Sequence, residues 1–140
     1  FVMYIRNFLQ CFSILYRQTF QDLDVKLKPY GITASQYMYI LCVCENEGLS
    51  QEQICDRLKI DRAPVARAVR ILEERGYITR TASADDKRQN QLHSTEKGKQ
   101  IYNDINTIVE KYEANLLSGL TDIEKNVMKN LLMKVIEGLY

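Results

Sequence analysis

The fold is decided by residues 61–98, DRAPVARAVRILEERGYITRTASADDKRQNQLHSTEKG. The first part of this stretch has the period of an amphipathic helix, because apolar residues recur three and four positions apart. These residues are Val65, Ala68, Val69 and Leu72. Asp61 can cap the helix by accepting from free N–H groups of the first turn, and Pro64 is tolerated inside that turn. Gly76 stands where a left-handed residue ends a helix. We therefore predict a helix between Asp61 and Gly76.

The second part of the stretch predicts a two-stranded hairpin with a charged tip. Residues 77–81 (YITRT) are rich in the β-branched and aromatic residues that favour strands. Residues 85–88 (DDKR) form a polar turn, and residues 89–93 return as the second strand. Thr95 then suits the N-cap of another helix. This is the layout of a winged helix-turn-helix, whose helix enters a major groove of DNA while its hairpin reaches a minor groove.

Two motifs with fixed spacing lie in the same stretch. A pattern D-x-R-x-x-x-L-x-L-T-x-x-G is matched by Asp86, Arg88, Leu92, Thr95 and Gly98. A preceding pattern L-E-x-x-G-Y/L-I-x-R is matched by Leu72, Glu73, Gly76, Tyr77, Ile78 and Arg80. Both patterns resemble those of the MarR family of bacterial transcription regulators, which usually has leucine where this chain has Ser94. The resemblance covers essentially the whole chain and implies a mainly α fold with a small antiparallel β-wing.

Two helices are expected before the decisive stretch. The first spans residues 4–28 and ends at Pro29. The second begins with Thr33 as N-cap and runs to about Glu45. Its inward side is predicted to carry Tyr37, Ile40, Leu41 and Cys44.

A third, short helix over residues 51–58 is expected to complete the helix-turn-helix. Ser50-x-x-Gln53 has the spacing of a capping box, in which each side chain bonds the other residue's backbone N–H. The resemblance also implies a short strand near Leu49 that pairs with the wing.

The two ends of the chain carry apolar stripes longer than a small lobe needs for its own core. They lie in the first helix, in a helix over residues 95–117 and in a last helix opened by the capping box Thr121-x-x-Glu124. The resemblance implies that residues 1–30 and 99–140 are dimerisation helices around a DNA-binding lobe at 31–98. The chain would then be a single protomer of a homodimer, with two recognition helices about one DNA turn apart on a pseudo-palindromic operator.

The average charge hides an uneven distribution. The 140-residue chain has a formal net charge of +1, yet residues 57–88 carry nine Lys/Arg and five Asp/Glu, a balance of +4, which leaves −3 for the remainder. Basic charge is therefore concentrated on the segment shaped to contact DNA, although an ordinary solvated helix face would look similar. No apolar run approaches the roughly 18 residues of a membrane span. The N-terminus, which lacks an initial Met, does not resemble a signal peptide, so we expect a cytoplasmic protein.

The eight expected DNA contacts lie on the predicted helix and at the hairpin tip. They are Arg62, Ala63, Pro64, Ala66, Arg67, Arg70, Lys87 and Arg88. An arginine on the helix can read guanine, and one in the wing can enter a narrow minor groove. Asp86 is expected to orient an arginine rather than touch DNA, and Arg88 could instead pair with an acidic neighbour. Arg75 and Arg80 are equally well explained as surface ion-pair partners.

The four cysteines and the single histidine do not form a metal site, because no C-x-x-C spacing is present. Reduced thiols packed in or near the core explain Cys42, Cys44 and Cys55. Cys11 is a candidate redox switch, because one branch of the family resembled here senses organic peroxides through a first-helix cysteine. His93 receives no role.

The resemblance implies a repressor that a small molecule releases from DNA. A small amphipathic or phenolic ligand could bind among Tyr16, Tyr30, Tyr37 and Met38, although the same residues would also suit a core. We expect no enzyme activity and no cofactor, since no catalytic constellation or phosphate-binding loop is present. A winged-helix module that binds other proteins is the alternative from a different class.

Overall fold

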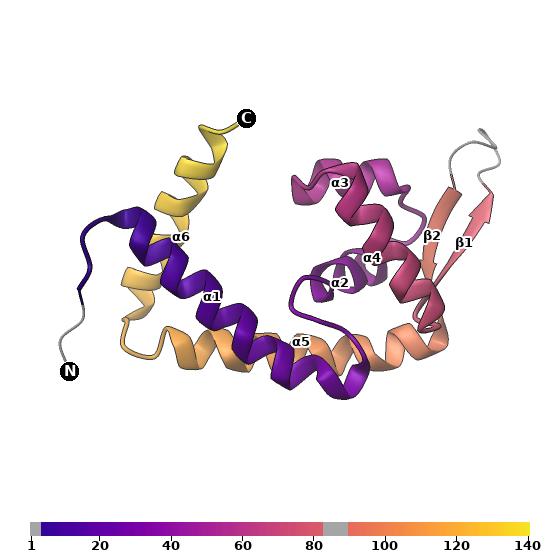
Figure 1. Ribbon diagram of the computed structural model, residues 1–140, viewed down its shortest axis with the longest axis horizontal. Coiled ribbons are helices and arrows are strands. Elements are labelled where there is room, and N and C mark those ends of the chain that lie inside the picture. The colour runs from indigo at the N-terminus through magenta and orange to yellow at the C-terminus, as the bar shows by residue number, and fades with distance from the viewer. Residues whose placement is uncertain (1–3, 83–89) are drawn as a thin grey trace. The chain divides into compact units, whose positions relative to one another are not determined.

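The computed structural model describes residues 4–82 and 90–140. Its helices and strands, labelled in Figure 1, are α1 (Phe8–Leu27), α2 (Tyr37–Glu45), α3 (Gln51–Leu58), α4 (Arg62–Glu74), β1 (Ile78–Ala82), β2 (Asn90–Ser94), α5 (Glu96–Leu116) and α6 (Asp122–Glu137). A 3₁₀ turn, η1 (Lys28–Tyr30), follows α1. Contacts divide the chain into the units Phe1–Thr107 and Ile108–Tyr140, with the boundary inside α5. The predicted mainly α fold with a small antiparallel hairpin is confirmed.

Helix α1 begins four residues later than predicted. Asn7 is its N-cap, and the Asn7 side chain accepts a hydrogen bond from the Gln10 backbone N–H at 3.0 Å. This bond satisfies one of the unpartnered N–H groups of the first turn, which the apolar stripe alone could not indicate. The helix ends at Leu27, before a turn closed by Gly31 at φ 69°.

The prediction that Thr33 caps α2 is wrong. Residues 33–36 form a separate turn, in which the Gln36 N–H donates to the Thr33 carbonyl at 3.0 Å and the Gln36 side chain accepts from the Thr33 N–H at 3.0 Å. The turn is tied to α1, because the Ala34 N–H donates to the Asp24 carboxylate at 2.7 Å. Helix α2 therefore starts only at Tyr37.

The inward face of α2 also differs from the prediction. Of the four residues expected there, only Ile40 is buried, and Tyr37, Leu41 and Cys44 are half-buried. The buried residues of the helix are Tyr39, Ile40, Cys42 and Val43. A nine-residue helix packed against both α4 and β2 buries two sides, so a single stripe could not describe it.

The helix-turn-helix formed by α3 and α4 matches the prediction. The capping box is present, with the Gln53 N–H donating to Ser50 Oγ at 3.2 Å and the Ser50 N–H donating to Gln53 Oε1 at 2.9 Å. In α4 the predicted apolar residues Val65, Ala68, Val69 and Leu72 are all buried. Asp61 is at the N-cap of α4 but makes no side-chain cap bond. Gly76 follows the helix at φ 78°, as the left-handed cap position requires.

The hairpin pairs β1 with β2 in antiparallel register, with Arg80 opposite Leu92. Leu49 adds a single bridge on the other edge of β2, where the Leu92 N–H donates to the Leu49 carbonyl at 2.8 Å. The short strand predicted near Leu49 is thus confirmed as one bridge. Thr95 caps α5 as predicted, because its hydroxyl accepts from the Gly98 N–H at 3.0 Å.

The second unit contains the end of α5 and all of α6. The second predicted capping box is confirmed, with the Glu124 N–H donating to Thr121 Oγ1 at 3.2 Å and the Thr121 N–H donating to Glu124 Oε1 at 3.0 Å. Every residue of α6, which falls wholly within the described range 90–140, is at least partly exposed in a single chain. Among the described residues, no helix has the length and apolarity needed to cross a membrane.

Candidate nucleic-acid interface

Helix α4 has a buried side and an exposed basic side. Its exposed residues at positions 62, 63, 66, 67 and 70 recur at the spacing of one helix face. Of the six α4 residues predicted to face DNA, Pro64 is half-buried and the other five are exposed: Arg62, Ala63, Ala66, Arg67 and Arg70. The opposite side is anchored by fully buried side chains, so the orientation of the basic face is fixed by core packing.

Three arginine side chains thus extend from a face that is otherwise lined by alanine. Small residues between long basic ones let a helix backbone approach a groove closely, while the guanidinium groups reach phosphates or base edges. At the N-terminal end of this face Arg62 lies 3.5 Å from a carboxylate oxygen of Glu52 on α3. Both side chains are mostly exposed, so this ion pair is weak and leaves Arg62 able to exchange partners.

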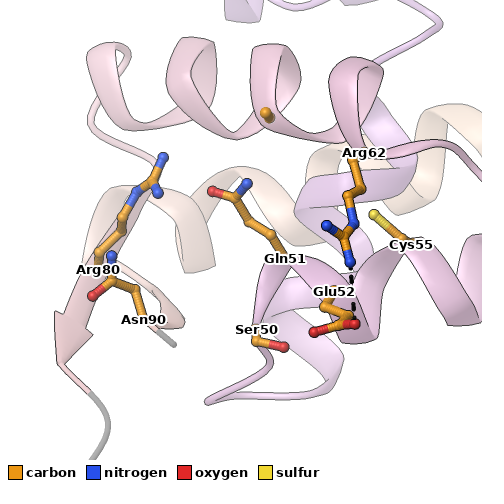
Figure 2. A pocket seen from close by; sticks show the side chains of 8 residues that line it. Ser50, Gln51, Glu52, Cys55, Arg62, Arg80 and Asn90 are labelled. Carbon is orange, nitrogen blue, oxygen red and sulfur yellow. Dashed lines mark hydrogen bonds and ion pairs between the residues drawn. The ribbon is translucent and has the colours of Figure 1, made fainter. Parts of the chain in front are cut away.

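A hollow lies between α3, α4 and the hairpin, as Figure 2 shows, and it borders the basic face of α4 at Arg62 and Ala66. It is lined by Ser50, Gln51, Glu52, Cys55, Arg62, Ala66, Arg80 and Asn90. Gln51 Oε1 is buried here, and no group among residues 4–82 and 90–140 donates a hydrogen bond to it. Gln51 and Asn90 were not among the predicted site residues. The capping box marked Gln51 as the first residue of α3, but its place opposite α4 depends on the tertiary fold.

The two arginines left open by the sequence have different surroundings. Arg80 Nε lies 2.5 Å from Glu73 Oε1, and both side chains are about one-third exposed. The ion-pair interpretation of Arg80 therefore describes the structure. The Arg75 guanidinium lies against Gly31, where an added Cβ would come within 3.1 Å of it. Asp86, Lys87 and Arg88 lie outside the described residues.

The four residues predicted to line a ligand pocket have separate surroundings. Tyr16 stacks on Phe20 with ring centroids 4.2 Å apart, and the Tyr30 carbonyl accepts a hydrogen bond from the Tyr77 hydroxyl. Burial, followed by the nearby Asp104 carboxylate, raises the pKa of the Tyr30 phenol. Met38 lines a hollow between α2 and α3 that is also bordered by Arg57. Tyr37, at the start of α2, is half-buried.

All four cysteines are free, as predicted. Burial raises the pKa of Cys44 to about 11 and also raises those of Cys42 and Cys55, which suits inert packing residues. Cys11 is half-buried on α1. His93, to which no role was assigned, has a partner, since its Nδ1 lies 3.1 Å from Glu47 Oε2. No cluster of three His, Cys, Asp or Glu side chains able to hold a metal occurs in the described part of the chain.

Comparison with known proteins shows to which family this architecture belongs. A model of the MarR family matches residues 30–89, which include α2, α3, α4 and β1. YybA, an uncharacterised helix-turn-helix transcriptional regulator of Bacillus subtilis strain 168, is 34% identical to this chain over 112 residues. The match covers 80% of this chain and 75% of YybA. The chain belongs to the MarR family.

Two further relatives agree with this assignment, and one of them was solved with DNA. BilQ, a helix-turn-helix transcriptional regulator of Clostridioides difficile strain CD3, is 32% identical to this chain over 106 residues. The match covers 75% of this chain and 72% of BilQ. A Listeria monocytogenes protein assigned to the MarR family was solved in complex with a 26mer DNA. It is 32% identical with a TM-score of 0.89, covering 96% of this chain and 90% of that one. This MarR-family chain is thus a DNA-binding transcriptional regulator, and the relatives named here are regulators rather than enzymes.

Proposed function

We propose that the chain is a repressor that binds a pseudo-palindromic operator as a homodimer and leaves it when a small ligand binds. The observation that carries this proposal is the exposed arginine–alanine face of α4, which core packing holds in a fixed direction. A second copy would place another α4 on the neighbouring major groove, about one DNA turn away.

The residues of α4 have different tasks in this proposal. Arg62 and Arg67 lie in the N-terminal half of α4, the part of a recognition helix that contacts base edges, and each can donate two hydrogen bonds to guanine. Arg70 lies one turn further along and serves as a phosphate contact. Ala63, Pro64 and Ala66 allow close approach and offer apolar contact to thymine methyl groups.

The residues between β1 and β2 supply the second contact. Arg88 is proposed to enter the minor groove, where a narrow groove concentrates negative potential. Lys87 is proposed to bind a phosphate. Asp86 would orient an arginine, because a carboxylate is repelled by the phosphates themselves.

The homodimer is supported by apolar side chains that a single chain leaves exposed. On α1 they include Phe8, Leu9, Phe12, Leu15 and Tyr16. On α6 they include Ile123, Val127, Leu131, Leu132, Val135 and Ile136. Because exposed apolar surface of this extent marks an interaction site, we assign both faces to the interface with a second copy of the chain.

Release by a ligand is proposed from the chemistry of four aromatic and thioether side chains, which lie in separate surroundings in the single chain. Tyr16, Tyr30, Tyr37 and Met38 remain the proposed lining, and they suit an amphipathic or phenolic molecule. Oxidation of Cys11 is the second release mechanism, favoured by the partial exposure of Cys11 on α1. Replacing Cys11 by serine separates the two, since only the redox mechanism loses peroxide-induced release.

Selection of binding sites from a randomised DNA pool tests the proposed function. Enrichment of an inverted repeat with half-site centres roughly 10 base pairs apart is the expected result. The selection is repeated with refolded protein, because a carried-over ligand would suppress binding. Failure of both preparations to enrich any sequence would favour a winged-helix module that binds proteins instead.

A further inference from the structure

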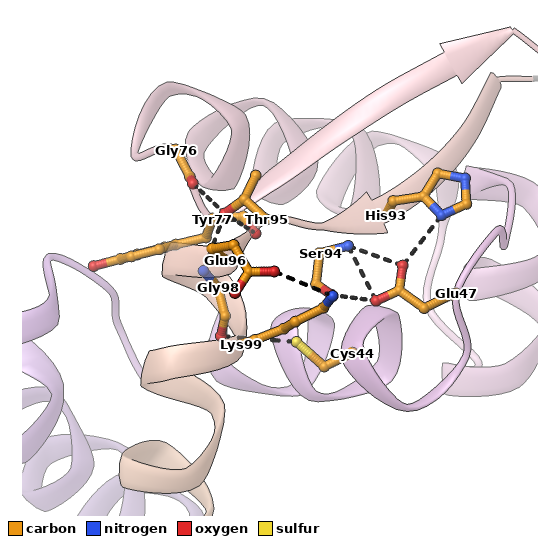
Figure 3. A network of polar contacts seen from close by, with 10 residues as sticks. All are labelled: Cys44, Glu47, Gly76, Tyr77, His93, Ser94, Thr95, Glu96, Gly98 and Lys99. Atoms are coloured by element: carbon orange, nitrogen blue, oxygen red, sulfur yellow. Dashed lines mark hydrogen bonds and ion pairs between the residues drawn. The ribbon is translucent and has the colours of Figure 1, made fainter.

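The Glu47 side chain joins the turn between α2 and α3 to the base of the hairpin (Figure 3). Its Oε2 accepts a hydrogen bond from the Ser94 backbone N–H at 3.0 Å and lies 3.1 Å from His93 Nδ1. Its Oε1 accepts from the Ser94 hydroxyl. The Ser94 N–H also lies 3.3 Å from Oε1, so one carboxylate has four contacts with two consecutive residues of β2, 46 and 47 positions away in the sequence.

The Ser94 N–H needs this carboxylate because no backbone carbonyl of residues 4–82 or 90–140 is paired with it on that edge of β2. The Leu92 N–H points away from β1 and donates to the Leu49 carbonyl. N–H groups two residues apart on a strand point to the same edge, so the Ser94 N–H points that way as well. The third strand consists only of the bridge at Leu49, which leaves Glu47 to supply the next acceptor. Its side chain extends the pairing of β2 by one residue.

The chemistry of positions 93 and 94 suits a carboxylate. A serine donates twice to Glu47, through its N–H and its hydroxyl, whereas the leucine that is usual in the family would donate only once. Hydrogen bonds to a charged acceptor are roughly twice as strong as neutral ones. Both Glu47 and His93 are only about one-third to two-fifths exposed, so solvent competes less with this pairing than on an open surface.

We propose that Glu47 is a positioning residue for DNA binding, which fixes the direction of the hairpin through Ser94 and His93. This inference rests on the proposed function, because it requires the hairpin to contact DNA. The hairpin leaves the lobe at β1 and β2, and its distal residues contact the minor groove in that proposal. A small change of angle at Ser94 becomes a larger displacement at Ala82 and Asn90, the far ends of the two strands. Holding the base before DNA arrives also removes part of the ordering cost of binding.

A double-mutant cycle tests this proposal with the full chain and the selected operator. Glu47→Ala is expected to weaken operator binding about tenfold, the effect of one charged hydrogen-bonding group. In an Arg88→Ala background, which removes the proposed minor-groove contact, Glu47→Ala is expected to reduce operator affinity by less than about twofold. In an Arg67→Ala background, which leaves the wing intact, the tenfold loss is expected to remain.

Two further variants separate positioning from charge. Glu47→Gln keeps an acceptor and is expected to recover part of the lost affinity. Asp56→Ala removes the same charge from an exposed site on α3, and is expected to leave affinity unchanged or slightly stronger. Equal losses for Glu47→Ala in all three backgrounds would overturn the inference alone. No operator binding by the unmodified protein would overturn both proposals.

Amide hydrogen exchange provides a readout that does not depend on DNA. In Glu47→Ala the Ser94 amide is expected to exchange at least tenfold faster, because its acceptor is gone. The Leu92 amide, bonded to the Leu49 backbone, is the internal control and is expected to keep its rate. Faster exchange at both positions would mean general loosening of the hairpin and would contradict a specific positioning role, as would no change at either.

Discussion

Gly98 lies against the backbone of Tyr77 so closely that a side chain would not fit between them. A Cβ at position 98 would lie 3.1 Å from the Tyr77 carbonyl carbon and nearer still to the carbonyl oxygen. That oxygen also accepts from the Thr95 N–H at 3.0 Å, so the start of α5 is bonded directly to the residue before β1. The place of Gly98 in the wing motif thus has a steric cause in this chain.

Gly98→Ala is expected to destabilise the protein by about 2–4 kcal/mol, because backbone atoms cannot move aside as a flexible side chain can. Urea denaturation followed by circular dichroism measures this change. Gly119→Ala is the matched control, since a Cβ there meets nothing within 4 Å, and it is expected to change stability by less than about 0.5 kcal/mol. Similar losses for both variants would show that the close approach at Gly98 is not the cause.

Arg67→Ala and Arg70→Ala are expected to weaken DNA binding in different ways. If Arg67 contacts a base, Arg67→Ala should cost about 1–3 kcal/mol of binding free energy on the selected operator and much less on unrelated DNA. If Arg70 contacts a phosphate, Arg70→Ala should weaken binding to both DNAs equally. It should also reduce the slope of log affinity against log salt by about one. Fluorescence anisotropy at several salt concentrations measures both effects. A uniform loss for Arg67→Ala would refute its assignment as a base-reading residue.

The elements of the helix-turn-helix were predictable because their signals are local. The apolar period of α4, Gly76 after it and the capping box before α3 all lie within a few residues of what they determine. The start of α2 was mispredicted because Thr33 has the chemistry of a cap, yet it bonds within its own turn. The Asp24 carboxylate that ties this turn to α1 comes from ten residues away, where no helix signal points to it.

The partners of single side chains were less predictable than the elements. Glu47 and Ser94 are 47 residues apart, and nothing in either neighbourhood indicates the other. The sequence around Arg80 was compatible with both a DNA contact and an ion pair. Only the distance of 2.5 Å between Arg80 Nε and Glu73 Oε1 in the folded chain distinguishes the two roles. Gln51 was overlooked for the same reason. Its burial opposite α4 is a property of the packed lobe rather than of its segment.

Leu131→Glu is expected to convert the protein into a monomer if α6 forms the dimer interface. Leu131 is 55% exposed in the single chain, so the charge costs little there. In a dimer it would be buried without a partner, which costs about 3–5 kcal/mol. Light scattering after size exclusion measures the mass, and operator binding should fall with it. Lys129→Glu, on the same helix but outside the apolar set, should leave the dimer intact. A Leu131→Glu dimer would remove α6 from the interface.

Stability is expected to fall with rising pH through ionisation of Cys44. Burial raises the pKa of the folded thiol from 9.0 to about 11, so between those values the unfolded chain loses a proton that the folded chain keeps. The folded state then binds more protons than the unfolded state, and the free energy of unfolding decreases as pH rises. Because Cys44 is only half-buried, we discount the full shift and expect a loss of about 1–2 kcal/mol between pH 8.5 and 10.5.

Urea denaturation at the two pH values measures this loss, with Cys44→Ala as the control. The control lacks the titrating thiol and should lose correspondingly less stability over the same range. Burial also raises the pKa values of Tyr39 and Tyr77, which act in the same direction above pH 10 and remain in the control. The same raised pKa should protect Cys44 from iodoacetamide at pH 8 in the folded protein, because only the thiolate reacts. Rapid alkylation of Cys44 under those conditions, detected by peptide mass spectrometry, would contradict its assignment as an inert packing residue.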